Sequence, residues 1–328
     1  MVKFIRVSKY LYILFPRRDI SGNANVIIIR NPKDGKVSFI DSGSVKDPGI
    51  NLIKRVLNPI NPSFRDSKLI ITHSHLDHCH ASGLFQKTFD SKIYAHERIK
   101  IEGKISPRDP DMASHFDEYL ESFYPFIKDR LIKNIGYYMY SRLYYGKHYD
   151  IIINKKVKTG DIIEVSPFKL EVIYTPGHSP DSIVLYERSK KLLFLGDFIP
   201  WTPYPHCSIA HFRKSIRKIL DLDVKLVIRG HGYPHKWEIE KKNFLDFLDD
   251  MKQAQLRILN CLKKRPMTLE EISRNAYERT HFTHNLFYTI LMKMTQFWAI
   301  KYIDDLIKRD MIKSSDANLN NKKIYSLK

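Results

Sequence analysis

Three histidines and one aspartate lie within six residues of this 328-residue chain, in the run His73–His78 (sequence HSHLDH). They follow the apolar run Leu69–Ile71, which has the composition of a buried strand. So many polar side chains cannot be buried together without partners. Imidazole and carboxylate groups are ligands that borderline divalent metals accept in proteins. The cluster therefore predicts a site for two adjacent divalent ions, with further ligands supplied from elsewhere in the chain.

Other candidate ligands stand directly after apolar, strand-like segments, each close to a glycine. His178 ends the run Thr-Pro-Gly-His, Asp197 follows Leu-Gly, and His231 lies between two glycines. A further strand-ending carboxylate, Asp41 in Phe-Ile-Asp-Ser-Gly, precedes these residues along the chain and is not itself a ligand candidate. Glycine permits sharp backbone turns, and functional residues collect in loops that a rigid sheet positions. We therefore predict that the ends of several strands bring these side chains together.

The five motifs, in this order, resemble the metallo-β-lactamase superfamily, in its glyoxalase-II-like or RNase-Z-like branch, over about residues 8–240. The resemblance implies an α/β fold, the αββα metallo-β-lactamase sandwich, with a dinuclear metal site at one edge of the two sheets. The implied ligands are, for the first metal, His73, His75 and His178; for the second, Asp77, His78 and His231; and, bridging the two, Asp197.

The same resemblance implies a chemistry. The metals are two divalent ions, zinc in most members of this branch and iron or manganese in others. Two ions about 3.5–4 Å apart share a hydroxide and lower the pKa of its parent water from about 15.7 toward roughly 7. This hydroxide would attack an electrophilic carbonyl or phosphorus atom, and the second metal would stabilise the oxyanion. Asp41 would orient the ligand loop. The expected catalytic residues are His73, His75, Asp77, His78 and Asp197.

Several other residues near these motifs are predicted not to bind metal. Cys79 and His80 directly follow the cluster, but so tight a loop cannot direct every side chain at the metals. His206 follows the aromatic run Trp201–Pro205 beyond Asp197 and is a candidate for lining the substrate pocket. The histidines expected at the surface or behind the ligands are His96, His206, His211 and His235.

The elements predicted to position these residues alternate short strands with helices, which indicates a layered α/β domain. The predicted strands are 10–15, 25–30, 36–40, 67–72, 92–96, 151–153, 162–165, 170–174, 182–186, 192–195 and 224–228. Helical periodicity covers 52–57, 80–89 and 211–220. Residues 98–150 interrupt the alternation with a tyrosine-rich helical insertion, which fits packing on the host domain, a cover over the active site, or a homodimer contact.

From about residue 251 the pattern becomes helical, which predicts a catalytic domain of residues 1–250 and a C-terminal domain of residues 251–328. Thr268 and Glu271 have the spacing of a capping box at the start of a helix. The other predicted elements are a helix at 252–263, a third helix from about 283 with a break near 296–299, and strands at 311–315 and 323–327. Three helices followed by a hairpin are typical of a winged helix, a relative of the helix-turn-helix.

Composition limits the class of protein and its partners. The net charge of +19 and pI near 9.6 favour acidic partners such as nucleic acid, although the charge is spread along the whole chain. No apolar run reaches the roughly 18 residues of a membrane span, and the run at 10–15 is too short for a signal-peptide core. We therefore expect a cytoplasmic protein without membrane contact. The three cysteines show no paired spacing and predict no disulfide.

Two functions fit these features, because the same metal site serves both. Our first expectation is a hydrolase acting on an ester, thioester or lactone carbonyl of a small-molecule substrate. The alternative is an endo- or exonuclease-like phosphodiesterase acting on RNA or single-stranded DNA, favoured by the basic charge, the clustered tyrosines and the winged-helix-like tail. A third class is a regulatory protein whose tail contacts DNA. The helix expected at 283–294 lacks a dense Arg/Lys face, which disfavours sequence-specific DNA recognition.

Overall fold

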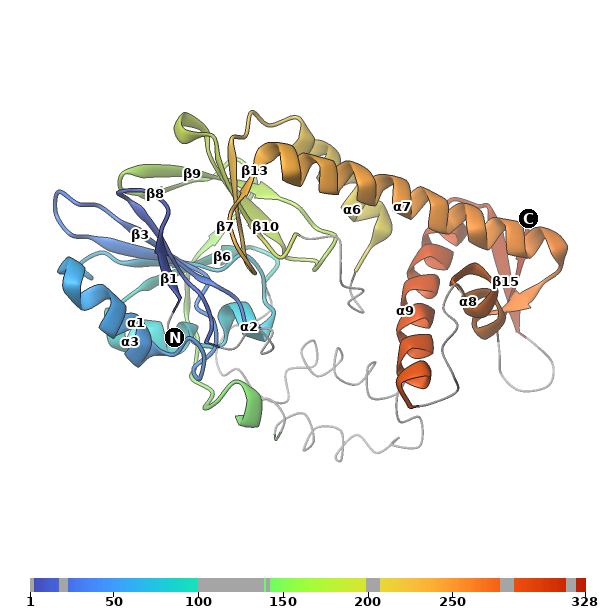
Figure 1. The fold of residues 1–328 in the computed structure, drawn as a ribbon, viewed down its shortest axis with the longest axis horizontal. Helices are drawn as coiled ribbons and strands as arrows, with labels where there is room; N and C mark the ends of the chain where they lie inside the picture. Colours follow the sequence, from blue (N-terminus) through green and yellow to red (C-terminus); the bar gives the residue numbers. More distant parts are fainter. Residues whose placement is uncertain are drawn as a thin grey trace.

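Two β-sheets face each other in the left half of the view in Figure 1, and helices cover their outer faces. The computed structural model describes residues 3–17, 23–99, 139, 142–198, 207–277, 286–316 and 323–328. The first sheet has seven strands in chain order: β1 (Phe4–Arg6), β2 (Leu11–Leu14), β3 (Val26–Arg30), β4 (Val37–Ile40), β5 (Lys68–Ile70), β6 (Lys92–His96) and β7 (Ile153–Val157).

The second sheet has six strands in the order β13-β12-β11-β10-β9-β8. Its members are β8 (Ile162–Val165), β9 (Phe168–Tyr174), β10 (Ile183–Glu187), β11 (Leu192–Gly196), β12 (Leu226–Arg229) and β13 (His235–Lys236). The outer helices of the first sheet are α1 (Ile50–Leu57) and α3 (Ser82–Phe89), and those of the second are α6 (Ile209–Leu220) and α7 (Trp237–Lys264). The short elements are α2 (Leu76–Cys79), η2 (Asn58–Ile60) and η3 (Arg188–Lys190).

Side-chain alternation explains why the sheets stack. Successive strand residues point to opposite faces. In β2, Leu11 and Ile13 pack against the second sheet, whereas Tyr12 and Leu14 pack into the core beneath α1 and α3. All four residues of this strand are buried, which is the pattern of a sheet covered on both faces. This αββα arrangement confirms the predicted fold class.

One predicted strand is displaced. The sequence predicts a strand at 151–153, but β7 begins only at Ile153. Gln86 takes the place of a neighbouring strand at Ile152: its Oε1 accepts from the Ile152 amide at 3.0 Å and its Nε2 donates to the Ile152 carbonyl at 2.9 Å. The backbone groups of Ile152 are therefore satisfied by a side chain, and pairing with β6 starts one residue later.

The C-terminal part contains α8 (Leu269–Tyr277), α9 (Leu286–Lys308) and a sheet of β14 (Met267–Thr268), β16 (Lys323–Leu327) and β15 (Ile312–Asp316) in that order. The capping box is confirmed, since Thr268 N donates to Glu271 Oε2 at 2.8 Å and Glu271 N donates to Thr268 Oγ1 at 3.3 Å. The predicted break at 296–299 is wrong, because α9 is continuous. Ala299, Ile303 and Leu306 bury one helical face there, and such packing outweighs local propensity.

A single core joins the second sheet to the C-terminal part. Helix α7 runs without interruption past residue 250, so the predicted domain boundary falls inside one helix. The cluster that covers the sheet includes Leu193 and Phe212 and continues through Met251 to Ile303 and Tyr325. Truncation at residue 250 would therefore expose part of this core to solvent. The division into two domains stays a prediction.

Some predicted features lie outside the described residues. These are most of the helical insertion (residues 100–138 and 140–141), the run Trp201–Pro205 with His206, and the turn at 317–322. In the part of the chain that the structure describes, no helix combines the length and the apolar character that crossing a membrane requires.

Candidate metal centre

The predicted ligands converge at one end of the sandwich, in segments that follow strands of both sheets. Strands β4 and β5 are parallel, and so are β11 and β12, which places the carboxyl ends of these strands at one edge. The ligands come from the segment after β5 and from α2 (His73, His75, Asp77 and His78), from the loop after β9 (His178), from the end of β11 (Asp197) and from the loop after β12 (His231).

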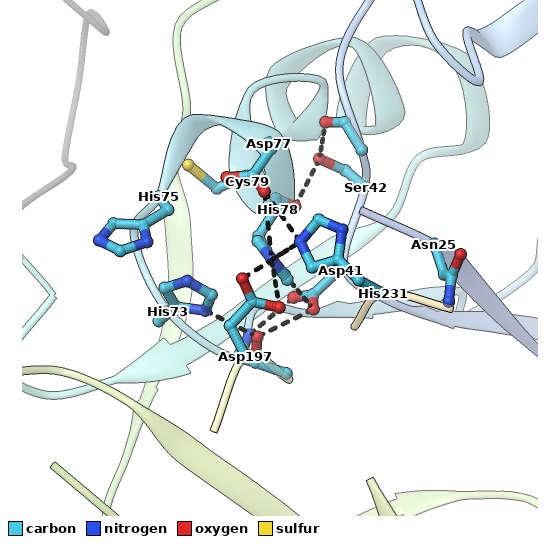
Figure 2. Close-up of polar contacts among 12 residues, drawn as sticks. Asn25, Asp41, Ser42, His73, His75, Asp77, His78, Cys79, Asp197 and His231 are labelled. Atoms are coloured by element: carbon cyan, nitrogen blue, oxygen red, sulfur yellow. Dashed lines mark hydrogen bonds and ion pairs between the residues drawn. The ribbon is translucent and has the colours of Figure 1, made fainter. Parts of the chain in front are cut away.

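The seven side chains form two groups of metal-ligand type. His73, His75 and His178 make one group, and the ligand atoms within it all lie within 4.8 Å of one another. The second group, with the same spacing, consists of Asp77, His78, Asp197 and His231 (Figure 2).

Asp197 lies between the two groups. Its Oδ2 is 3.1 Å from His231 Nε2 and 3.9 Å from His178 Nε2. The structure thus brings all the predicted ligands together, with Asp197 at the position that a bridging ligand requires. Their role as ligands stays a prediction.

The donor set fits divalent metals. His75 Nδ1 faces His178 Nε2 at 2.9 Å, and His78 Nε2 faces His231 Nε2 at 3.3 Å. Two imidazole lone pairs repel each other unless a proton or a metal ion lies between them. His73 Nε2 is buried and has no hydrogen-bond partner among the described residues. Three imidazoles in one group, and two imidazoles with two carboxylates in the other, are donor sets that zinc accepts.

Burial and charge prepare these groups to bind a cation. Burial lowers the pKa of His178 to about 4 and that of His73 well below its ordinary value, so these imidazoles stay neutral and keep their lone pairs. In the other group burial lowers the pKa of His231, but Asp197 and Asp77 outweigh it and raise the pKa to about 10. The negative charge of these two carboxylates favours a proton on His231 when no metal is bound. A bound metal ion would replace that proton.

Asp41 fixes the ligand loop from behind. Its Oδ1 accepts from Thr72 N, and its Oδ2 accepts from Thr72 Oγ1 and His78 Nδ1, each at 2.8 Å. A proton on Nδ1 leaves Nε2 of His78 available to a metal, which is the usual arrangement behind a ligating histidine. Asp41 has a φ of 57°, a left-handed conformation that aspartate tolerates better than most residues. This geometry agrees with the orienting role implied by the resemblance.

Replacing Asp41 with asparagine is expected to weaken metal retention or lower activity by about 10- to 100-fold. The asparagine amide nitrogen cannot accept the hydrogen bonds that Oδ2 accepts from Thr72 and His78. The measurement is metal content after dialysis against graded chelator, together with kcat. Asp161→Asn, in the turn between β7 and β8, serves as the control. Metal retention and kcat both equal to those of the wild type would remove Asp41 from this role.

Two supporting residues were missed by the sequence analysis. Asn25, before β3, donates from Nδ2 to the carbonyl of Gly232 at 2.8 Å, and its amide donates to Gly230 O at 2.7 Å, so it holds the His231 loop. The buried Asp181 carboxylate accepts from Ser179 Oγ at 2.7 Å. The position of Asp181, three residues after a candidate ligand, was a usable signal, whereas nothing in the local sequence distinguishes Asn25.

The residues predicted not to bind metal stand apart from the ligand set. Cys79 Sγ donates to Ser74 O at 3.4 Å, and burial raises the pKa of its thiol well above the ordinary value. His80 Nδ1 accepts from Val45 N at 3.3 Å. His96, predicted to lie at the surface or behind the ligands, is buried and stacks on Tyr174, with ring centroids 4.3 Å apart.

Metal analysis of protein produced with added zinc is expected to find about two divalent ions per chain, because the two donor groups are separate and each is complete. Removing the ions with a chelator should lower Tm, since an ion that binds only the folded state stabilises it. Plasma emission spectrometry and a thermal melt provide the two readouts. Protein that contains no metal after production with added zinc, although its circular dichroism spectrum shows that it is folded, would contradict the site.

Comparison with known proteins agrees with this geometry. The profile of the metallo-beta-lactamase superfamily matches residues 21–231. The hydroxyacylglutathione hydrolase of Haemophilus influenzae is 28% identical over 172 residues, which cover 50% of this chain and 68% of that protein. The acyl-coenzyme A thioesterase of Gallus gallus is 32% identical over 88 residues, which cover 24% of this chain and 31% of that protein.

A solved structure extends the likeness to nearly the whole chain. A metallo-beta-lactamase family protein from Thermus thermophilus superposes with a TM-score of 0.69 at 17% identity, covering 98% of this chain and all of that one. Fold, site geometry and family profile agree. The chain belongs to the metallo-beta-lactamase superfamily and is a metal-dependent hydrolase.

Proposed function

We propose that the protein is a dinuclear-metal thioesterase that hydrolyses a small-molecule thioester. The observation that carries this proposal is that the two ligand groups meet at Asp197, whose Oδ2 lies 3.1 Å from His231 Nε2 of one group and 3.9 Å from His178 Nε2 of the other. Relatives named for hydroxyacylglutathione and acyl-coenzyme A hydrolysis support the thioester class among the carbonyl substrates. In this proposal His73, His75 and His178 would hold one metal, Asp77, His78 and His231 would hold the other, and Asp197 would contribute to both.

The chain's own residues divide the remaining work. Two bound divalent metals would supply an activated water and positive charge for the developing oxyanion. Asp77, with its side chain 13% exposed and Oδ2 3.1 Å from His231 Nε2, is placed to accept a proton and pass it to the leaving thiolate. His231 is 31% exposed, whereas His73, His78 and His178 are almost fully buried. His75, in the other group, is partly exposed as well, and we infer that substrate enters where His75, Asp77 and His231 reach the surface.

Phosphodiester hydrolysis is the second candidate, and two observations favour it. The net charge of +19 suits a polyanionic substrate. The C-terminal part follows the order helix, strand, two helices and two strands, through the end of α7, β14, α8, α9, β15 and β16. We propose that this unit is a winged helix, an architecture that many nucleic-acid-binding proteins use.

A parallel assay separates the two candidates. Zinc-loaded protein is tested on an acylglutathione, an acyl-coenzyme A, a lactone, bis-p-nitrophenyl phosphate and a labelled single-stranded RNA. The thioesterase proposal expects kcat/KM for one thioester to exceed that for every other class by at least about tenfold. Protein carrying Asp77→Asn, purified in the same way, reports contaminating activity. Cleavage of RNA or phosphodiester with no thioester turnover would transfer the assignment to the second candidate.

A further inference from the structure

A row of basic side chains lies on the exposed face of α6, beside the loop that carries His178. His211, Lys214 and Lys218 are spaced three and four residues apart, which places them on one side of the helix, and all three are exposed. The opposite side of α6, including Phe212 and Ile216, is buried in the core. The row is therefore fixed in place by the packing of the helix beneath it.

Helix α6 is anchored to the loop that carries the candidate ligand. Ser208 N donates to Gly177 O at 2.9 Å, and Ser215 Oγ donates to Pro176 O at 2.8 Å. Lys218 Nζ donates to Tyr174 O at 3.2 Å, four residues before His178. The helix thus begins beside the metal loop and runs back along the end of β9. Its first residue and Lys218 are about 13 Å apart along the axis, at about 1.5 Å per residue.

Two more cations join the row from other elements. The guanidinium carbon of the exposed Arg98 lies 5.3 Å from the ring centroid of Tyr174, the residue whose carbonyl accepts from Lys218. Lys308 of α9 follows Asp305 by three residues, and Asp305 pairs with Arg213 of α6 at 2.7 Å. We call Arg98, His211, Lys214, Lys218 and Lys308 the basic cluster.

The charges of the basic cluster are poorly compensated. The pKa of His211 is lowered, mainly by burial and then by the positive charges of Lys308, Lys214 and Arg98. These three cations therefore act on the same side chain. Within the described ranges, none of the four permanent cations forms an ion pair with a carboxylate. Two carboxylates lie at the borders of the basic cluster. Glu97 interacts electrostatically with Tyr174, and Asp304 interacts electrostatically with Lys308. Unpaired cations held close together on a fixed surface attract a multivalent anion.

We propose that the basic cluster binds the phosphate groups of a thioester whose thiol is carried by a phosphorylated nucleotide, as in an acyl-coenzyme A. This inference rests on the proposed thioesterase function and names its substrate class. The row begins at the metal loop and extends on the order of 10 Å beyond it, so the anion lies away from the reacting carbonyl. A carrier with a long flexible arm between its thiol and its phosphates can span the distance from the metal loop to the basic cluster. Lys and Arg are the usual partners of phosphate oxygens.

The kinetic test compares two thioesters with the same acyl group and the same pantetheine arm, one with the nucleotide (butyryl-coenzyme A) and one without it (butyryl-pantetheine). Wild-type protein is expected to have a KM for butyryl-coenzyme A about tenfold lower or more. In Lys214→Glu/Lys218→Glu, the ratio of kcat/KM for the two substrates should fall about tenfold, since two contacts become repulsions. The matched control is Lys241→Glu/Lys252→Glu on α7, which changes the net charge equally at exposed positions and should keep the wild-type ratio.

A binding measurement tests the cluster without turnover. Calorimetry with adenosine 3′,5′-bisphosphate should detect binding that weakens as ionic strength rises and that is lost in Lys214→Glu/Lys218→Glu but not in the control. Calorimetry measures nucleotide binding even if the protein hydrolyses no thioester. The result can therefore contradict the basic-cluster proposal and the thioesterase proposal independently of each other. Equal KM values for the two thioesters together with absent nucleotide binding would overturn the inference. So would single-stranded RNA that binds more tightly than the bisphosphate and gains affinity with length.

Discussion

Replacing Asp77 with asparagine is expected to lower kcat/KM by about 10²- to 10⁴-fold while the protein stays folded. Asparagine has nearly the same volume as aspartate, so the packing around α2 is kept. It cannot accept a proton, and it removes a negative charge 3.1 Å from His231 Nε2 and 3.5 Å from His78 Nε2. Both the proposed proton transfer and the charge balance of the second ligand group are therefore lost.

The measurement for Asp77→Asn combines kcat/KM on the best substrate of the parallel assay with metal content and a thermal melt. Asp223→Asn is the control, because Asp223 forms only an exposed ion pair with Lys191 and such pairs contribute little. Wild-type kcat/KM in Asp77→Asn, with both metals retained, would exclude this side chain from the mechanism. A large loss in the Asp223 control as well would show that the assay reports general damage.

Replacing Gly230 with alanine is expected to reduce the metal content to about one ion per chain or fewer and to lower activity by about 100-fold. A Cβ atom at this position would lie 2.6 Å from Asp197 Oδ1 and 2.6 Å from His78 Cε1, closer than atoms can approach. The added Cβ would also lie 3.0 Å from the backbone carbonyl carbon of Gly196, so the backbone at residue 230 cannot easily shift to relieve the clash. The clash therefore falls on two members of the same ligand group, and only glycine leaves them room.

Gly232→Ala provides a matched control on the other side of His231. A Cβ there meets nothing within 4 Å, but the residue has a φ of +74°, which disfavours any side chain. We expect a loss of about 1–2 kcal/mol of stability with the metals retained. Metal analysis, thermal melts and kcat on the two variants separate crowding of the site from backbone strain. Full metal content in Gly230→Ala would show that the second ligand group is not formed as described.

The convergence of the candidate ligands could be predicted because its signals are local. The run from His73 to His78 concentrates donors within a few residues, and each distant ligand follows an apolar strand and neighbours a glycine. Strand ends of a layered sheet meet at one edge, so order along the chain implied proximity. Asn25 carries no such signal, since its partner Gly232 is 207 positions away and the contact is made only when both sheets have stacked.

Two structural errors have the same origin. The strand expected at 151–153 has the right composition, but Gln86, 66 positions earlier, supplies the hydrogen bonds that a neighbouring strand would have given. The interruption expected within α9 reflected local propensity, whereas burial of Ala299 and Ile303 against the shared core keeps the helix continuous. In both cases a distant partner outweighed the local preference.

By itself, the sequence determined the alternation of buried strands and helices and the chemistry of the metal donors, because residue type and short-range spacing encode both. The family resemblance implied how those donors divide into two groups with Asp197 between them, but only the tertiary structure decided the distances within each group and that Gly230 must lack a side chain. It also placed the lysines of α6 beside the metal loop and joined the C-terminal helices to the catalytic core. These outcomes depend on distances between residues remote in the chain, which are set only when the sheets and helices pack.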